Sequence, residues 1–236
     1  MTSDWSLAAL TVMMLAVVGL GVFAGARRSG AEVRSASGAA LKTMLALSVW
    51  LGLVSFLAVR GVLSNWTALP PRWPLLPLTA FITIWFLMRS PAATRILTSI
   101  PAAWLIATQC FRIGVELSLY ALHAAGRAPV QITFEGRNFD ILVGLSAPLM
   151  AWLLATGRLG EKAALAWNVL GLAILANTVA TVATSAPGPL HHAWPGAPLT
   201  AIASWPTVWL PAFLMPLAVF LHVASLRQNV RALRSK

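Results

Sequence analysis

The chain has 236 residues, of which 58% are hydrophobic and only 10% charged, and its formal net charge is +11. A soluble domain is typically about 45–50% apolar and about 25% charged, so this composition excludes an ordinary soluble domain. In a soluble protein the basic excess would suggest nucleic-acid binding. Here long apolar runs separate the charges, and nucleic acid is not an expected partner.

Apolar runs bounded by charged residues, proline or glycine recur along the whole chain. A helix needs about 20 residues to cross a hydrocarbon core of about 30 Å, and backbone groups in lipid must be hydrogen-bonded within the segment. We therefore predict an all-α fold, one integral membrane domain of residues 1–236 that forms a polytopic bundle of seven transmembrane helices. The predicted spans are about residues 5–25, 43–63, 75–88, 98–123, 140–157, 163–185 and 206–226.

Lysine and arginine are unevenly distributed over the loops between these spans. With the N-terminus outside, 12 of the 17 basic residues fall in cytoplasmic segments: Arg27, Arg28, Arg34, Lys42, Arg89, Arg95, Arg158, Lys162, Arg227, Arg231, Arg234 and Lys236. The positive-inside rule then favours an N-out, C-in orientation, which requires an odd number of spans and supports the short third one. Composition and short loops predict a multi-pass protein of a bacterial inner (cytoplasmic) membrane, surrounded by the lipid bilayer.

Arg60, near the outer end of the second span, runs against this charge asymmetry. Two expectations stay open for it. Its long side chain reaches the interface, or it faces Glu116 or Glu135 from across the bundle.

The fourth span carries a polar face. Gln109, Arg112, Glu116, Tyr120 and His123 follow one another at intervals of three or four residues, so all of them lie on one side of a helix. An ionised residue at the centre of a span costs about 2.5–3.5 kcal/mol on insertion scales, which makes two of them a functional hypothesis. Arg112 and Glu116 can pair, but arginine has five donors, and partners on other helices are expected. The face either lines a polar cavity or packs against another helix.

The loop after the fourth span, residues 126–141, carries Glu135 and Arg137, which a turn at Gly136 would direct to the mouth of the bundle. Asn138 or Asp140 is expected to cap the fifth span, because side-chain oxygens satisfy the first backbone donors of a helix and its dipole favours an acid there.

In the sixth span, Asn177, Thr181 and Thr184 lie on one face, where they line a pocket or form the interhelical hydrogen bonds common in membranes. The following loop, residues 186–206, has no charged residue and is expected to form a re-entrant or interfacial lid. His222, near the cytoplasmic end of the seventh span, is expected to be interfacial.

Prolines interrupt two of the predicted spans, at Pro148 in the fifth and at Pro211 and Pro216 in the seventh. Each proline leaves the carbonyl four residues before it without its helical donor. Such carbonyls line a cavity or mark a plain kink.

Motifs exclude several classes of membrane protein. Lys42, Lys162 and Lys236 all lie at predicted cytoplasmic ends, so none can form a retinal Schiff base in the seventh span, and the Pro-Gln pair of one class of seven-span carriers is absent. The single cysteine, Cys110, excludes an internal disulfide and a CxxC site. HExxH, P-loop and GxSxG patterns are absent as well. We predict no metal site, and the sequence identifies no cofactor.

Together these features predict an integral membrane protein with a buried Arg/Glu polar pocket, open to the outer face, that binds or transports a small polar or anionic ligand. One alternative is a membrane-embedded enzyme that acts on a lipid-like substrate at the outer leaflet, with Glu116 as its acid and base. Another is an accessory or assembly subunit whose polar face packs on a helix of a partner membrane protein. The predicted site comprises Arg112, Glu116, Tyr120, His123, Gln109, Asn177, Thr181, Glu135, Arg137 and Arg60.

Overall fold

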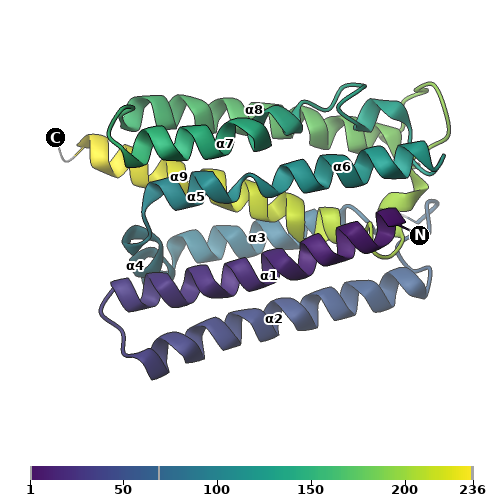
Figure 1. Cartoon of the computed structure of the whole chain (residues 1–236). Coiled ribbons are helices and arrows are strands. Elements are labelled where there is room, and N and C mark those ends of the chain that lie inside the picture. The colour runs from purple at the N-terminus through teal and green to yellow at the C-terminus, as the bar shows by residue number, and fades with distance from the viewer. Residues whose placement is uncertain (1, 69, 235–236) are drawn as a thin grey trace.

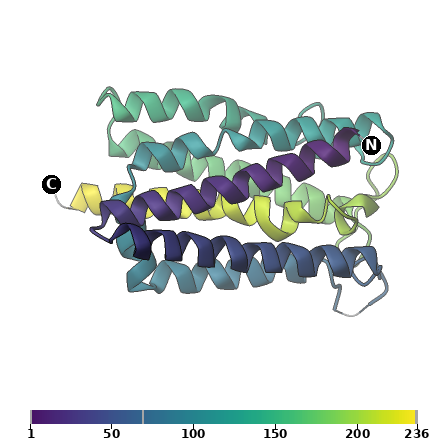
Figure 2. The ribbon, with the colours of Figure 1, turned by 60° about the horizontal axis from the view of Figure 1, so that its bottom comes forward.

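The computed structural model describes residues 2–68 and 70–234, with side chains from Trp5 onward, so Lys236 lies outside the described residues. Within that range every regular element is helical (Figure 1). The elements are α1 (Thr2–Arg28), α2 (Val33–Val59), α3 (Leu75–Arg89), α4 (Pro91–Ser99), α5 (Ala102–Thr108), α6 (Phe111–Ala124), η1 (Val130–Ile132), α7 (Asp140–Ala155), α8 (Glu161–Ser185), η2 (Thr200–Ala203), η3 (Leu210–Leu214) and α9 (Met215–Arg234). The long helices lie side by side, and the start of α1 and the end of α9 are at opposite ends of the bundle (Figures 1 and 2).

The helices bear out the membrane character of the sequence. Five of them in the described chain are long and apolar enough to cross a membrane, or six if the bent pair α3–α4 forms one span. The five are α1, α2, the segment Ala102–Ala124 that comprises α5 and α6, α8, and the segment Leu210–Arg234. The all-helical architecture is thus confirmed. Because α7 is a shorter apolar helix, the count of seven spans and their orientation remain predictions.

The predicted fourth span, residues 98–123, is broken in the structure. Pro91 begins α4, which bends by 81° from α3, and Pro101 precedes α5. Since proline lacks an N–H and suits the start of a helix, both breaks follow from the sequence. A third break separates α5 from α6, where Gln109 and Cys110 donate their backbone N–H groups to the carbonyls three residues before them. The polar face of α6 begins at this tightened turn.

The prolines of the last span produce an irregular helix start. Residues Leu210–Leu214 form a π turn that contains Pro211, and α9 continues from it. The carbonyl of Ala212, which Pro216 deprives of its helical donor, accepts a hydrogen bond from Trp50 Nε1 at 3.0 Å. The carbonyl of Thr207 accepts from the backbone N–H of Leu210 at 3.0 Å. Both carbonyls are therefore satisfied inside the protein.

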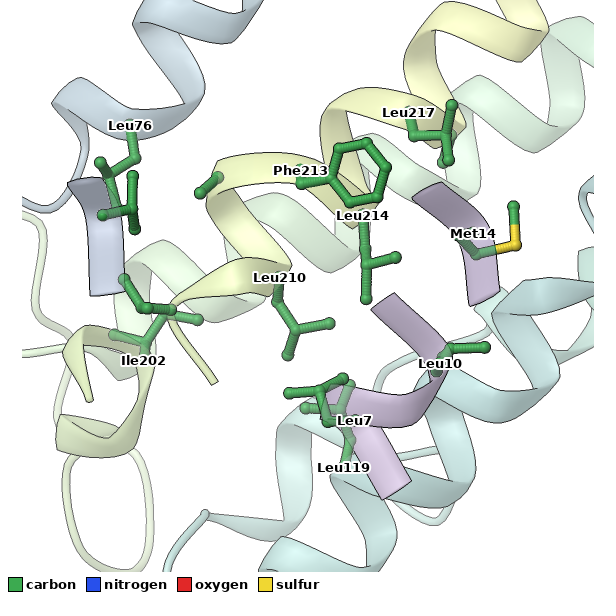
Figure 3. Packing of buried hydrophobic residues seen from close by; sticks show 14 of the residues in the cluster. Leu7, Leu10, Met14, Leu76, Leu119, Ile202, Leu210, Phe213, Leu214 and Leu217 are labelled. Atoms are coloured by element: carbon green, nitrogen blue, oxygen red, sulfur yellow. The ribbon is translucent and has the colours of Figure 1, made fainter. Parts of the chain in front are cut away.

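The hydrophobic core is continuous from α1 to α9. Figure 3 shows Leu7 and Leu10 of α1 beside Leu119 of α6, with Leu210 and Leu214 of the π turn above them. All five side chains are buried. Packing of this kind joins segments that are far apart in the chain, so the π turn is fixed from several sides.

Candidate functional site

The deep half of the polar face on α6 is fully inside the bundle. Gln109, Arg112 and Glu116 are 1%, 2% and 0% exposed. Gln109, which precedes α6, donates from Nε2 to the carbonyl of Ala218 on α9 at 3.1 Å. These three residues are therefore enclosed by neighbouring helices.

The outer half of the same face, Tyr120 and His123, is less buried and does not contact the inner half. Tyr120 is 36% exposed, and its ring stacks on Phe134 with the centroids 5.1 Å apart. His123 is half-buried, and its Nδ1 lies 2.9 Å from the carbonyl of Ala128 in its own loop. Both side chains are thus engaged locally, away from Arg112.

Arg112 binds two side chains from other helices. Its Nη2 donates to Oδ1 of Asp140, at the start of α7, and forms an ion pair. Its Nη1 donates to Nε2 of His222 on α9 at 3.0 Å. The expected partners on other helices are thus present, and the carboxylate that holds the guanidinium belongs to Asp140, whereas Glu116 is engaged elsewhere.

The two residues expected to cap the fifth span have separate roles. The side-chain Oδ1 of Asn138 accepts the backbone N–H of Asp140 at 3.1 Å, which satisfies a donor at the start of α7. Asp140 is only 5% exposed and directs its carboxylate to Arg112. The N-cap residue is Phe139, so neither predicted residue occupies the cap position: Asn138 satisfies one backbone donor from the residue before it, and Asp140 is the counter-ion of the site.

The expectation of an interfacial His222 is wrong, because this side chain is fully buried. Its Nδ1 lies 2.9 Å from Oδ1 of Asn168 on α8. Asn168 uses its Nδ2 to donate to the carbonyl of Ala164 at 2.7 Å and to Ser225 Oγ at 2.9 Å, which leaves Oδ1 as the acceptor facing the ring. His222 therefore carries its proton on Nδ1, and the lone pair on Nε2 accepts from Arg112: the imidazole is neutral.

Two glycines allow α8 to approach α9 beside His222 and α7 to approach α6 beside Arg112. A Cβ atom at Gly171 of α8 would lie 2.8 Å from Nε2 of His222. A Cβ atom at Gly144 of α7 would lie 2.9 Å from the backbone nitrogen of Ile113 and 3.4 Å from Cβ of Arg112. Real Cβ atoms are essentially never found closer than 3.0 Å to another group, so the absence of a side chain admits both neighbours.

Glu116 is held by Asn138. Its Oε1 accepts from Asn138 Nδ2 at 2.6 Å, and the same Nδ2 donates to the carbonyl of Ile132 at 3.0 Å. Oδ1 of Asn138 also accepts from Thr178 Oγ1 of α8 at 2.7 Å. The other oxygen of Glu116, Oε2, has no hydrogen-bond partner among the described residues.

These contacts form one buried network that joins α6, α7, α8 and α9, which we call the polar cluster. Its members are Arg112, Glu116, Asn138, Asp140, Asn168, Thr178, His222 and Ser225. A network of this kind in a low-dielectric interior fixes its members strongly when each is satisfied, and it is costly where one is not.

A cavity of about 190 Å³ lies beside the polar cluster. Its walls come from the start of α3, from α6 and α8, from η2 and from the π turn that leads into α9. Almost all of the lining side chains are apolar; the polar ones are Arg112, Glu116, Asp140, Thr178 and Thr207. The cavity is therefore an apolar chamber with one polar region in its wall.

The uncharged loop 186–206 contributes to the wall of this cavity. Leu199 and Ile202 line the cavity and are almost fully buried, and the backbone N–H of Leu199 donates to the carbonyl of Ser185 at 2.8 Å. This part of the loop thus packs into the bundle, and its role as a lid stays a prediction.

Three charged residues of the predicted site are exposed, and none of them lines the cavity: Glu135 and Arg137, which were expected at the mouth of the bundle, and Arg60. The guanidinium of Arg137 lies 5.1 Å from the ring centroid of Trp194, and that of Arg60 lies 5.8 Å from the ring of Phe56. The structure therefore does not bring these charges to Arg112 or Glu116.

The predicted residues of the sixth span are occupied within the protein. Asn177 donates from Nδ2 to the carbonyl of Arg137 at 2.7 Å, and Thr181 donates to the carbonyl of Asn177 at 2.9 Å. The α8 residue that lines the cavity with a polar side chain is Thr178, one position beyond Asn177. The sequence reasoning therefore selected a neighbouring face of this helix.

Among the described side chains, no group of three or more histidine, cysteine, aspartate or glutamate residues is placed to hold a metal ion. The thiol of Cys110 is exposed. The polar region of the cavity instead offers hydrogen-bond donors, hydrogen-bond acceptors and one ion pair.

Comparison with known proteins places this site in a family. No curated protein and no solved structure matches the chain. Residues 74–230 match a family model whose description is "Domain of unknown function (DUF8737)". That range extends from the residue before α3 into the last turns of α9 and contains the whole polar cluster. Because the matched range is well over half of the chain, the protein belongs to the DUF8737 family.

Proposed function

We propose that this protein is a multi-pass membrane protein that binds, and in doing so carries or senses, a small lipid-soluble molecule with one polar end. The observation that supports this most directly is the cavity of about 190 Å³ with the polar cluster in its wall. An apolar cavity of about 150 Å³ accommodates benzene, whereas drug-sized ligands occupy about 300–1,000 Å³. The ligand is therefore a short chain, a small ring or one end of a longer lipid.

The half-buried rim of the cavity supports entry from the bilayer. Pro77 of α3 and Val179, Val182 and Ala183 of α8 form part of it, and none carries a polar side chain. A charged substrate that arrived through such a rim would lose its hydration without compensation. A lipid-soluble molecule loses little, so this entrance favours it over the wholly polar or anionic ligand that the sequence suggested.

The charge of the polar cluster also disfavours an anion. Asp140 neutralises Arg112 in the wall of the cavity. An incoming anion would have to displace Asp140 from the guanidinium. The buried arginine is therefore better understood as a fixed structural charge than as an anion receptor.

For the topology we propose seven crossings with the N-terminus outside and the C-terminus inside, in a bacterial inner membrane. The bent pair α3–α4 and the short α7 supply the two crossings beyond the five long apolar helices. The start of α1 and the end of α9 lie at opposite ends of the bundle, which supports an odd number of crossings (Figure 2). The apolar side chains that α2 exposes, among them Leu45, Val49 and Phe56, support contact of this helix with lipid.

A reporter that is active only in the cytoplasm is expected to be active when it is fused after Lys236, because the basic residues near the end of α9 favour the inner side. The same reporter inserted after Ser64, in the loop beyond α2, is expected to be inactive. Activity measured in whole bacterial cells for both fusions distinguishes the orientations. The opposite pattern would reverse the topology.

Filling the cavity is expected to abolish binding. Ala183 lines the rim, whereas Ala180 is on the exposed side of α8 and does not line the cavity. In lipid nanodiscs, hexan-1-ol should raise the unfolding temperature of the wild type, because a ligand that binds only the folded state stabilises it. The increase in unfolding temperature should be smaller for Ala183→Phe, whose cavity is filled. Ala180→Phe, the matched control, should respond as the wild type does. An equal response in all three proteins would contradict the proposed function.

A further inference from the structure

A second candidate site lies at the end of the bundle where the chain gathers its basic residues. The end of α1, the start of α2, the helix α4 and the end of α9 lie there together (Figure 1). Among the described residues of this end, only Glu32 and Glu161 are acidic. The excess of positive charge attracts anionic partners to this end of the protein.

A groove between α4 and α9 lies at the same end. Its residues are Thr94, Leu97 and Thr98 of α4 and Ala224, Arg227, Gln228 and Arg231 of α9. The two arginines are four residues apart, as are the two threonines, so each pair lies on one face of its helix. None of these described residues lines the cavity beside the polar cluster. The groove is therefore a separate place, with guanidinium groups on one wall and hydroxyl groups on the other.

Hydrogen bonds fix the walls of the groove. Arg227 donates from Nη1 to the carbonyl of Met88, next to the last residue of α3. Gln228 donates from Nε2 to the carbonyls of Leu97 and Ile100, the latter at 3.0 Å. These bonds join α9 to the end of α3 and to α4, so the groove is part of the fold before any ligand binds.

The arginines of the groove have donors to spare. Neither Arg227 nor Arg231 forms an ion pair within the part of the chain that the structure describes, and none of the described groove residues carries a carboxylate. A guanidinium has five N–H donors, of which Arg227 uses one on Met88, and arginine binds phosphate through such donors in pairs. The space of about 10 Å³ in the groove holds about one water-sized group. A single phosphate oxygen therefore enters, and the rest of the phosphate lies above it.

The groove is at the depth of lipid head groups. The helix α4 bends by 81° from α3 and so runs across the direction of the bundle. Its Ile96 and Leu97 pack against the core, whereas Arg95 and Thr98 are exposed, the pattern of an amphipathic helix in a membrane interface.

Tryptophans mark the same level. Indole rings prefer the membrane interface, and three exposed ones at this end lie with their ring centroids 3.2–4.5 Å from a guanidinium carbon. The pairs are Arg28 with Trp104, Arg89 with Trp85, and Arg158 with Trp152. The basic end is therefore surrounded by the head groups of one leaflet.

We propose that the groove between α4 and α9 binds the phosphate of an anionic lipid from the leaflet that surrounds the basic end. Arg227 and Arg231 donate to the phosphate oxygens, and the hydroxyl of Thr94 donates from the opposite wall. Thr98 gives its own hydroxyl hydrogen to the carbonyl of Thr94 at 2.9 Å. Basic pockets between membrane helices bind anionic head groups in this way. A soluble phosphate compound offers the same oxygens but has no acyl chain to hold it at the interface.

The first test compares lipids with equal acyl chains: phosphatidylglycerol, phosphatidylcholine and diacylglycerol. Bound lipid is counted by native mass spectrometry of the protein from micelles of an uncharged detergent. We expect phosphatidylglycerol to bind most tightly, and about tenfold more tightly than diacylglycerol, the effect of one hydrogen bond to a charged group. Equal binding of phosphatidylglycerol and diacylglycerol would overturn the phosphate site.

Soluble phosphates distinguish the source of the phosphate. Inorganic phosphate and glycerol 1-phosphate, each at about tenfold excess over phosphatidylglycerol, should not displace the lipid. Displacement by either compound would show that the groove binds a soluble phosphate, and the lipid assignment would be wrong.

The variant Arg231→Gln separates the groove from the general charge of this end. Arg231 is exposed and lines the groove, whereas Arg34 is exposed at the start of α2 and does not. Arg231→Gln should weaken phosphatidylglycerol binding about tenfold through the lost charge-assisted hydrogen bond. Arg34→Gln, the matched control, should weaken it less than about twofold at 0.15 M salt, which screens exposed charges over about 8 Å. Equal losses would mean that only the total charge attracts the lipid.

The opposite wall is tested with Thr94→Val, which replaces the hydroxyl by a methyl group of similar size. Phosphatidylglycerol binding should fall about fivefold, the effect of one neutral hydrogen bond, while diacylglycerol binding stays the same. Thr83→Val on α3, which also removes an exposed hydroxyl but lies outside the groove, should change neither affinity. Unchanged phosphatidylglycerol binding in Thr94→Val would contradict a site shared by α4 and α9.

Discussion

Replacing Asp140 with alanine is expected to lower the free energy of unfolding by about 3–5 kcal/mol, because it leaves the charge of Arg112 buried without its counter-ion. Arg112 is only 2% exposed and cannot turn to water. Its remaining partner, the neutral His222, accepts a hydrogen bond but supplies no negative charge. The loss is measured by unfolding the protein in mixed micelles and following its helical circular dichroism.

A matched control and a double variant make this prediction specific. Glu135→Ala removes a carboxylate from an exposed position and should change the stability by no more than about 0.5 kcal/mol. The double variant Arg112→Met with Asp140→Leu removes both charges, and apolar replacement of a buried ion pair is often neutral or stabilising by about 1–4 kcal/mol. It should therefore be more stable than Asp140→Ala. If Asp140→Ala is as mild as Glu135→Ala, the ion pair does not hold α6 to α7.

Apolar runs predicted the helices well because a membrane leaves few alternatives to helical structure. The third span, expected over 75–88, is α3 at Leu75–Arg89, and the sixth, expected over 163–185, is α8 at Glu161–Ser185. The separate helix α4 was not predicted. Most of its sequence, Pro91–Ser99, lies between the predicted third and fourth spans, although Pro91 at its start and Ser90 before it, whose Oγ caps the helix, are typical of a helix N-terminus.

The sequence predicted the part of the site that lies on one helix, but not the residues that other helices contribute. Periodicity placed Arg112 and Glu116 on a common face, and both are in the polar cluster. Periodicity within a helix does not say which other helices lie against that face, so Asp140 and Asn168 could not be assigned. One signal was available. In the last span His222, Ser225 and Asn229 recur at intervals of three and four residues, a second polar face, and all three are buried.

The same reasoning explains why the outer residues of the predicted site do not join it. A helical face is a stripe, and the neighbours of that stripe change along its length. Around Arg112 the neighbours are α7 and α9, whereas Tyr120 meets Phe134 and His123 meets its own loop. Position on the stripe therefore identified the polar residues, and depth in the bundle decided which of them belong to the cluster.

Replacing Gly171 with alanine is expected to lower the free energy of unfolding by about 1–3 kcal/mol, the cost of overpacking a filled interior. The added Cβ would lie 2.8 Å from Nε2 of His222, and hydrogen bonds from Arg112 and to Asn168 hold that ring in place. Gly52→Ala on α2 is the control. No atom lies within 4 Å of its added Cβ, so it should be neutral or stabilising by up to about 1 kcal/mol through helix propensity.

A double-mutant cycle decides whether the clash with His222 causes this loss. In a His222→Ala background the ring is absent, so adding a methyl group at Gly171 should cost little, and the two substitutions should be coupled by about 0.5–3 kcal/mol. Stabilities of the four proteins are measured by the same micelle unfolding assay. Additive losses would mean that Gly171 acts through its own backbone. Coupling would place the close contact between α8 and α9 at the imidazole, which holds Arg112 in the wall of the cavity.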